Sequence, residues 1–208
     1  MQMKTGKTIM SLMLSAISMI AISCSTAKIQ EQTATLLPEL VFTFNSKGEC
    51  IVKNAQKISK KDFSKLSQKD GLQWISTREI MPSGELAKND SYHLIRGRSP
   101  MSYFFEDGKI HSFFFNSATG RIASNPYPFE YDEKECRLII NNFATMQIVR
   151  LTNDEVGAVS LLGTDAEGKP TYAYTIYKQL SAAEVQAMKT KYGYEEPIQI
   201  IEKREEKE

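Results

Sequence analysis

The sequence predicts a mainly β domain of antiparallel type, and three observations support this. Between residues 72 and 180, short segments that suit β-strands recur, with a turn signal between one and the next. The turns fall at the even spacing of a meander that closes into a barrel of about eight or nine strands. One amphipathic segment, residues 181–192, follows the last of them and predicts a C-terminal helix.

Two elements are expected before the barrel. Residues 40–44 and 49–53 flank an Asn-Ser-Lys-Gly turn and predict a β-hairpin. Ser59 is placed to cap a short amphipathic helix that runs to about residue 68, with Phe63 and Leu66 on one face. We therefore expect a hairpin and a helix in front of the first barrel strand.

The barrel strands are delimited by turn residues, of which Asp107-Gly108 is the strongest hairpin dipeptide. In the final helix, Ser181 and Glu184 have the spacing of a capping box, and Gly193 is the expected C-cap. Its predicted apolar stripe consists of Val185, Met188 and Tyr192. The predicted strands cover residues 72–81, 91–96, 101–106, 109–116, 127–131, 136–142, 145–151, 156–163 and 171–178.

The N-terminus has the pattern of a secretory signal peptide. Lys4 and Lys7 precede an uncharged apolar run, residues 8–22, which is shorter than the roughly 20 residues of a membrane span. The closing Ala-Ile-Ser-Cys resembles the lipobox of bacterial lipoproteins, in which the cysteine, here Cys24, is acylated and becomes the new N-terminus. The alternatives are an ordinary signal peptide cut near Ser23, with Cys24 incidental, and a retained N-terminal anchor helix.

This assignment divides the chain into a signal peptide (1–23), a flexible lipid-anchored tether (24–38), a barrel domain (39–194) and a charged tail (195–208). Residue 25 is Ser rather than Asp, so the inner-membrane retention signal of some Gram-negative lipoproteins is absent. We expect an outer membrane lipoprotein of the cell envelope that faces the periplasm.

Charge and cysteine content restrict the function further. Without Lys4 and Lys7 the 26 basic residues become 24 against 25 acidic ones, and a chain so close to neutral is not built for nucleic acid. With Cys24 assigned to lipid, Cys50 and Cys136 remain. They either form a disulfide, which by chain entropy would contribute ~4 kcal/mol, or stay separate as small buried thiols.

A family resemblance appears in the order of elements and in a few residues. Gly71-Leu72-Gln73-Trp74 at the start, Tyr172 to Lys178 at the end, and the helix at 181–192 resemble the lipocalin-like (calycin) domain lipoproteins of Gram-negative anaerobic bacteria. Lipocalins usually have Gly-x-Trp, whereas this chain has Gly-x-x-Trp. The resemblance implies a barrel that binds a small ligand, and it makes Lys178 the basic residue expected against Trp74.

Residue patterns for catalysis or metal binding are missing from the sequence. His93 and His111 are the only histidines, and no H-x-x-H, C-x-x-C or H-E-x-x-H spacing occurs. Ser160 lacks the Gly-x-Ser-x-Gly elbow of a hydrolase nucleophile. We therefore expect no enzyme, no catalytic residues, no metal and no cofactor.

Aromatic residues are concentrated between residues 103 and 131, which hold nine of the 20 in the chain. Because neighbours in a strand face opposite sides, Phe113 and Phe115 share one face while Phe114 takes the other. Such rings either fill a solid core, line a lumen that holds a small apolar or amphipathic ligand, or form an exposed patch for an envelope protein partner. We expect ligand binding, with the structural lipoprotein as the alternative. The candidate ligand-lining residues are Trp74, Tyr103, Phe105, Phe113, Phe115, Phe129, Tyr172 and Tyr174.

Overall fold

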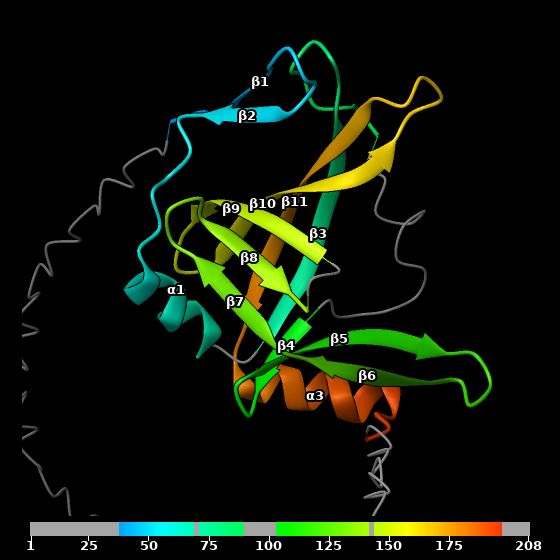
Figure 1. Ribbon diagram of the computed structural model, residues 1–208. Helices are drawn as coiled ribbons and strands as arrows, with labels where there is room; N and C mark the ends of the chain where they lie inside the picture. Colours follow the sequence, from blue (N-terminus) through cyan, green and yellow to red (C-terminus); the bar gives the residue numbers. More distant parts are fainter. Residues whose placement is uncertain (1–37, 69–70, 90–102, 142–143, 197–208) are drawn as a thin grey trace, which may run out of the picture. The chain divides into compact units, whose positions relative to one another are not determined.

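The computed structural model describes residues 38–68, 71–89, 103–141 and 144–196 (Figure 1). Within these residues nine strands form one antiparallel sheet in the order β6-β5-β4-β3-β11-β10-β9-β8-β7. The strands are β3 (Gly71–Ile80), β4 (Tyr103–Glu106), β5 (Lys109–Asn116), β6 (Arg121–Tyr127), β7 (Phe129–Asp132), β8 (Arg137–Ile140), β9 (Ala144–Leu151), β10 (Glu155–Thr164) and β11 (Pro170–Leu180).

The sheet curls into a nearly closed barrel, because its first strand β3 pairs with its last strand β11 along most of their length. The two remaining sheet edges are β6 and β7, which are consecutive in the chain and separated by Pro128 alone. The gap between these edges is therefore crossed by the chain itself. This architecture confirms the predicted fold class of an antiparallel barrel with an N-terminal hairpin and a C-terminal helix.

Strand β6 was not predicted, and its sequence explains why. Arg-Ile-Ala-Ser-Asn-Pro-Tyr carries Asn125 and Pro126, both typical of turns. A proline is tolerated in this strand because β6 lies at a sheet edge, where one side of the backbone makes no ladder bonds. The predicted strand at 91–96 lies outside the described residues, as do Cys24, the signal peptide and nearly all of the predicted tether.

The remaining predicted elements are present close to their expected bounds. Strands β1 (Val41–Phe44) and β2 (Cys50–Lys53) pair antiparallel as a separate hairpin. Helix α1 (Lys60–Ser67) begins after Ser59, whose side chain accepts a hydrogen bond from the Asp62 N–H. Helix α3 (Ala182–Tyr192) has the predicted capping box, and Gly193 closes it with φ 65° in the left-handed region.

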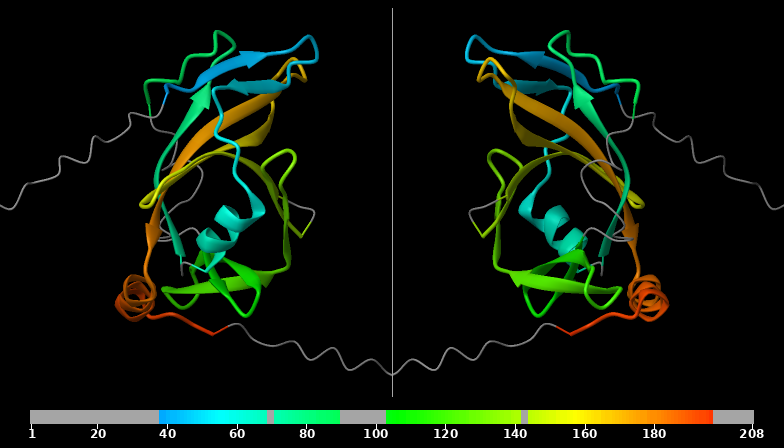
Figure 2. Two further views of the ribbon diagram at one scale, coloured as in Figure 1. Left: turned by 90° about the vertical axis from the view of Figure 1, so that its left-hand side faces the viewer. Right: turned by 90° about the vertical axis from the view of Figure 1, so that its right-hand side faces the viewer.

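Buried apolar residues of the described chain form three clusters, one inside the barrel and two on its outer face. The inner cluster includes Phe63 and Leu66 of α1, which lies across one end of the barrel (Figure 2). On the outside, Val185 of α3 packs on Phe104 and Phe113. Under the β1–β2 hairpin, Phe42 packs on Tyr174 with a ring-centroid separation of 5.6 Å.

The two cysteines of the domain are free thiols, which selects the second of the two alternatives predicted for them. Cys50 packs with the cluster under the hairpin, and burial raises the pKa of its thiol to about 11. Cys136 packs with the inner cluster, where its Sγ accepts a hydrogen bond from the Ile58 N–H at 3.4 Å. The two cysteines therefore pack in different apolar clusters, one outside the barrel and one inside it.

Candidate ligand cavity

The barrel interior is filled at the end that α1 covers and hollow farther along. The hollow has a volume of about 430 Å³, which lies within the range of small-molecule sites. Strands β3, β4, β9, β10 and β11 contribute its walls. The residues that line it are Trp74, Thr77, Tyr103, Ala144, Thr145, Met146, Ser160, Leu161, Leu162, Ala173, Thr175 and Tyr177.

Three aromatic rings lie together in the wall of this cavity. The Trp74 ring centroid is 5.7 Å from that of Tyr103 and 5.5 Å from that of Tyr177. The two tyrosine rings are 6.2 Å apart. All three residues belong to the inner cluster and are at least nine-tenths buried, so they form a fixed apolar surface.

A bulge in β3 brings a polar group to the same cavity. Trp74 pairs with Tyr177 and Ser76 with Ile176, so Ile75 has no opposite residue on β11. Such an extra residue shifts the side-chain alternation by one position. As a result Trp74 and Thr77 both face inward, and the Thr77 Oγ1 lies 3.1 Å from the Thr175 Oγ1 in a buried hydroxyl pair.

The lining carries no formal charge at neutral pH. Apart from the tyrosine phenols and the Trp74 indole, its polar side chains are the hydroxyls of Thr77, Thr145, Ser160 and Thr175. A charged ligand would lose its hydration in this cavity without gaining a counter-charge. An apolar ligand with one neutral polar group avoids this cost, because the hydroxyls can bind that group.

Of the eight predicted ligand-lining residues, the structure places Trp74 and Tyr103 at the cavity. Phe105 and Phe129 also pack against the inner cluster, with ring centroids 5.6 Å apart, but they do not line the hollow. Phe129 lies instead beside Phe63 of α1, at 6.2 Å. These two rings therefore belong to the filled end.

The other four predicted residues, Phe113, Phe115, Tyr172 and Tyr174, lie away from the lumen, which corrects the expectation that they line the ligand site. Phe113 is buried under α3, and Phe115 is 37% exposed. Tyr172 and Tyr174 pack under the β1–β2 hairpin. Strand alternation correctly grouped these residues in pairs, but it does not indicate which face is the inside.

Tyr177 was missed although its strand was predicted. On β11, Ala173, Thr175 and Tyr177 face the cavity, so Tyr172 and Tyr174 were chosen from the opposite face. The sequence signal that could have identified the inner face is the series Ala173, Thr175 and Tyr177 at every second position. Small side chains beside a ring leave space for a cavity, whereas Tyr172 and Tyr174 on the other face are both large. Lys178 also faces outward, where its Nζ lies 2.9 Å from the Glu184 Oε1 rather than against Trp74.

His111 is close to a serine hydroxyl, a combination that can occur in catalytic sites. The His111 Nδ1 is 3.2 Å from the Ser124 Oγ, which is 2.7 Å from the Tyr194 hydroxyl. His111 and Ser124 are 8% and 2% exposed, and neither lines the cavity. Burial lowers the pKa of His111, so the ring is neutral at neutral pH. This arrangement joins the segment after α3 to the barrel wall and offers no access to a substrate.

Within the described residues, no group of three or more His, Cys, Asp or Glu side chains could hold a metal ion. A helix long and apolar enough to cross a membrane is likewise not found in that part of the chain.

No protein-family model matches the chain, and no curated protein matches it. Among solved structures, a complex of bovine odorant-binding protein with undecanal is 12% identical, with a TM-score of 0.35, over 67% of this chain and 90% of that one. A complex of the same bovine protein with a selenium-containing odorant is 13% identical, with a TM-score of 0.33, over 69% and 98%. Similarities of this size leave the family open, and the barrel assignment depends on the strand order and register of this chain alone.

Proposed function

We propose that this protein is a membrane-anchored lipoprotein of the cell envelope whose barrel binds a small apolar or amphipathic molecule without catalysis. The observation that carries the proposal is the cavity of about 430 Å³ inside the barrel, walled by Trp74, Tyr103 and Tyr177. An eight-stranded barrel can be filled by side chains or can hold one small ligand, and this larger barrel retains the space for one.

The lining indicates the class of ligand. Its rings and aliphatic side chains suit a hydrocarbon body, and the hydroxyl pair of Thr77 and Thr175 suits one neutral polar group. Leu161 and Leu162 line the cavity and are also 57% and 45% exposed, so they form an apolar rim. A neutral alcohol, aldehyde or ester with an alkyl chain meets all of these conditions.

Binding can be followed directly, because Trp74 is the only tryptophan in the chain and lines the cavity. We expect 1-decanol to change the fluorescence of Trp74 in the full-length protein in a saturable manner. Decanoate, of similar length but anionic, should bind at least about tenfold more weakly, since the cavity offers no counter-charge. Native mass spectrometry of protein purified from its own envelope should detect the natural occupant. Equal affinity for the two probes would contradict the proposed neutral site.

A variant that fills the cavity gives the second test. Ala173 is 1% exposed and lines the cavity, so Ala173→Phe should occupy the space and abolish the decanol response. Ala183→Phe adds the same ring on an exposed position of α3 and should bind as the wild type does. If Ala173→Phe does not fold, Ser160→Leu narrows the cavity by a smaller volume. Unchanged binding in a folded variant of this pair would place the ligand elsewhere.

The envelope location rests on the lipobox-like sequence that ends at Cys24. Acyl chains attached there would hold the protein stably, because two chains already meet the two-signal requirement for lasting membrane binding. Cys24→Ala should abolish labelling by a fatty-acid analogue and release the protein from outer membranes, with Cys50→Ala as the matched control. Labelling that persists in Cys24→Ala would overturn the lipoprotein assignment.

A structural lipoprotein that docks an envelope protein is the second candidate. It is favoured by Phe114 of β5, which is 41% exposed and is aromatic like the residues enriched in interface cores. Crosslinking from position 114 to a single envelope protein, combined with no decanol response, would favour this function over ligand binding.

A further inference from the structure

The outer face of the β1–β2 hairpin carries apolar side chains that the domain leaves exposed. Val41 pairs with Lys53 and Thr43 with Ile51, and residues paired in this way project from the same side of a hairpin. The opposite side is packed on the barrel through Phe42. Val41 and Ile51 are diagonal neighbours on the outer side and are 44% and 46% exposed.

These exposed side chains continue to the mouth of the barrel cavity. Ile51 and Leu161 line a hollow of about 480 Å³ between the hairpin and the barrel wall. Leu161 also lines the barrel cavity together with Leu162, and these two leucines are 57% and 45% exposed. Val41, Ile51, Leu161 and Leu162 thus form one apolar surface, which reaches from the hairpin to the cavity.

The chain enters the domain beside this apolar surface. The Asn54 Nδ2 donates to the Glu39 carbonyl at 3.2 Å, which closes the end of the hairpin at which Val41 lies. One residue earlier, the Pro38 carbonyl accepts a hydrogen bond from the Arg150 guanidinium of β9. The hairpin and α3 lie at opposite ends of the domain in every view (Figure 1, Figure 2). The start of the domain is therefore fixed at the hairpin end.

The distance along the chain to the proposed lipid anchor limits what can cover the apolar surface. Residues 25–37 link Cys24 to Pro38. A chain of this length spans no more than about 50 Å when fully extended, and a flexible one averages about 20 Å. With Cys24 acylated, on which the inference rests as part of the proposed function, a bilayer is always within reach of the hairpin.

The charged residues beside the apolar surface are arranged for contact with lipid headgroups. Lys53 is exposed opposite Val41, so its stem can lie over apolar groups while its ammonium reaches lipid phosphates. Glu49 is exposed at the turn end of the hairpin, where the Asn45 Nδ2 donates to its Oε2 at 2.6 Å. The basic residue is therefore at the end where the tether enters, and the acidic one is at the far end.

We propose that the apolar surface lies on the bilayer that holds the lipid anchor. Val41 and Ile51 then contact the acyl chains just below the headgroups, and Lys53 contacts the phosphates. The mouth of the cavity at Leu161 and Leu162 lies at the membrane in this orientation. An apolar ligand passes between bilayer and barrel without exposing its hydrocarbon surface to water.

The test uses the full-length acylated protein in nanodiscs of phosphatidylcholine that contain a lipid with a gadolinium chelate on its headgroup. The chelate broadens the NMR signals of protein groups that approach the bilayer. The methyl signals of the apolar surface should be lost, while those of Val185, which packs under α3 at the other end of the domain, should keep their intensity. Equal intensity of the two sets would overturn the proposal.

Two variants locate the contact. Val41→Thr combined with Ile51→Thr keeps β-branched side chains in the hairpin but places a hydroxyl on each. In this double variant the methyl signals of Leu161 and Leu162 should recover. Phe114→Thr removes a side chain of similar exposure, 41%, from β5, and the signals should be lost as in the wild type. Loss of signal that persists in the double variant would contradict the proposal.

The outcomes also separate the bilayer from other occupants and from failure of the proposed function. Protein that is acylated and responds to decanol, but keeps full methyl signals in the nanodiscs, would overturn the membrane contact alone. Shifts of the Val41 and Ile51 signals that depend on protein concentration would assign the surface to a second copy of the chain instead. Protein without an acyl group would overturn the anchor and the membrane contact together.

Discussion

The two helices of the described residues, α1 and α3, begin in the same way and are held to the barrel differently. Ser59 caps α1 and Ser181 caps α3, each by accepting a backbone N–H from the third residue of its helix. Helix α1 then buries Phe63 and Leu66 in the barrel interior, whereas α3 buries only Val185 among its described residues. The short helix is thus part of the core, and the longer one is attached to the outside.

Polar and cation–π contacts attach α3 to the barrel, where α1 relies on buried apolar side chains. The Arg121 Nε donates to the Gly193 carbonyl at 2.8 Å, directly after the helix. The Lys189 Nζ lies 4.1 Å from the centroid of the Phe104 ring, which provides a cation–π contact. Apolar burial does not depend on pH, while charged and titratable contacts respond to pH and are screened by salt. The comparison therefore predicts that α1 is destabilised mainly by mutation of its buried residues. Helix α3 should be destabilised mainly by changes in pH or salt concentration.

The largest effect is expected for Phe63→Ala. The ring is 3% exposed and stacks on Tyr131 with centroids 4.0 Å apart and planes 3° from parallel. Removing it leaves a void in a filled region, so the free energy of unfolding should fall by about 3–5 kcal/mol, measured by urea denaturation.

Val185→Ala is the matched change in α3 and should cost about 2 kcal/mol, the value of the methyl groups removed. Decanol affinity should be retained in Val185→Ala, because Val185 packs on the outer face. An equal loss of stability in the two variants would mean that α3 contributes as much core as α1, and the contrast between the helices would fail.

Both helices were predictable because their signals are local. A capping serine and apolar residues at helical spacing lie within a dozen residues in each helix, α3 adds a C-cap glycine, and the strands of most hairpins are predicted from equally local signals. The assignment of faces is not local. Phe113 faces α3 and Tyr103 faces the lumen only because the sheet curls one way, and no short segment records that direction.

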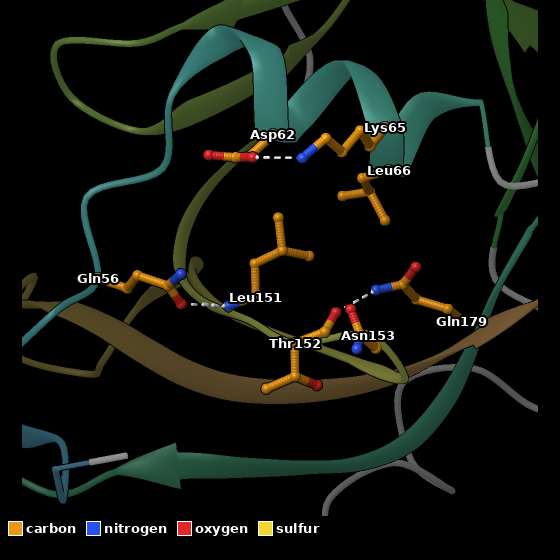
Figure 3. A pocket seen from close by; sticks show the side chains of 8 residues that line it. All are labelled: Gln56, Asp62, Lys65, Leu66, Leu151, Thr152, Asn153 and Gln179. Atoms are coloured by element: carbon orange, nitrogen blue, oxygen red, sulfur yellow. Dashed lines mark hydrogen bonds and ion pairs between the residues drawn. The ribbon is translucent and has the colours of Figure 1, made fainter. Parts of the chain in front are cut away.

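A smaller cavity beside α1, of about 290 Å³, shows the same limit more strongly (Figure 3). It brings Gln56, Lys65, Leu151 and Gln179 together from four separate parts of the chain, and each of these residues taken alone is ordinary for its position. The bulge at Ile75 is a further case, since it depends on the register between β3 and β11. Sequence patterns therefore predicted the elements, and tertiary pairing determined the sites.

An intermediate effect is expected when acid protonates His111. Its pKa is lowered first by burial; Lys189 and Lys109 act in the same direction, and Glu106 and Asp107 oppose it. Because the folded protein holds this ring neutral, the stabilisation is fully present above the ordinary pKa of 6.5 and is lost as pH falls below that value toward the lowered one. The protection factors for hydrogen exchange in residues 182–194, which correct for the intrinsic pH dependence of exchange, should therefore fall between pH 7 and pH 5 more than those in α1.

His111→Phe keeps a ring against Phe104, whose centroid is 4.3 Å from that of His111, and removes the titrating group. The variant loses the bond to Ser124 at every pH, so the protection factors of residues 182–194 should be lower overall but should no longer depend on pH in this range. A pH dependence that persists in His111→Phe would assign the acid response to another group.

The smallest effect is expected for Lys178→Met. The Lys178–Glu184 pair is short at 2.9 Å, yet both side chains are nearly half exposed, at 47% and 45%. Solvent screens such a pair, so the free energy of unfolding should change by less than about 1 kcal/mol and by still less in 1 M salt.

Glu184 also retains other partners without Lys178, because its Oε2 accepts the backbone N–H and the hydroxyl of Ser181, each at 2.9 Å. The bond from the Ser181 backbone is the main reason that the pKa of Glu184 falls to about 2, with Lys178 second. The stability that this carboxylate supplies is thus present above its ordinary pKa of 4.5 and is lost as pH falls from there toward 2. NMR titration of Lys178→Met should find the pKa of Glu184 still below 4.5. A return to the ordinary value would mean that the exposed ion pair, rather than the capping box, fixes the start of α3.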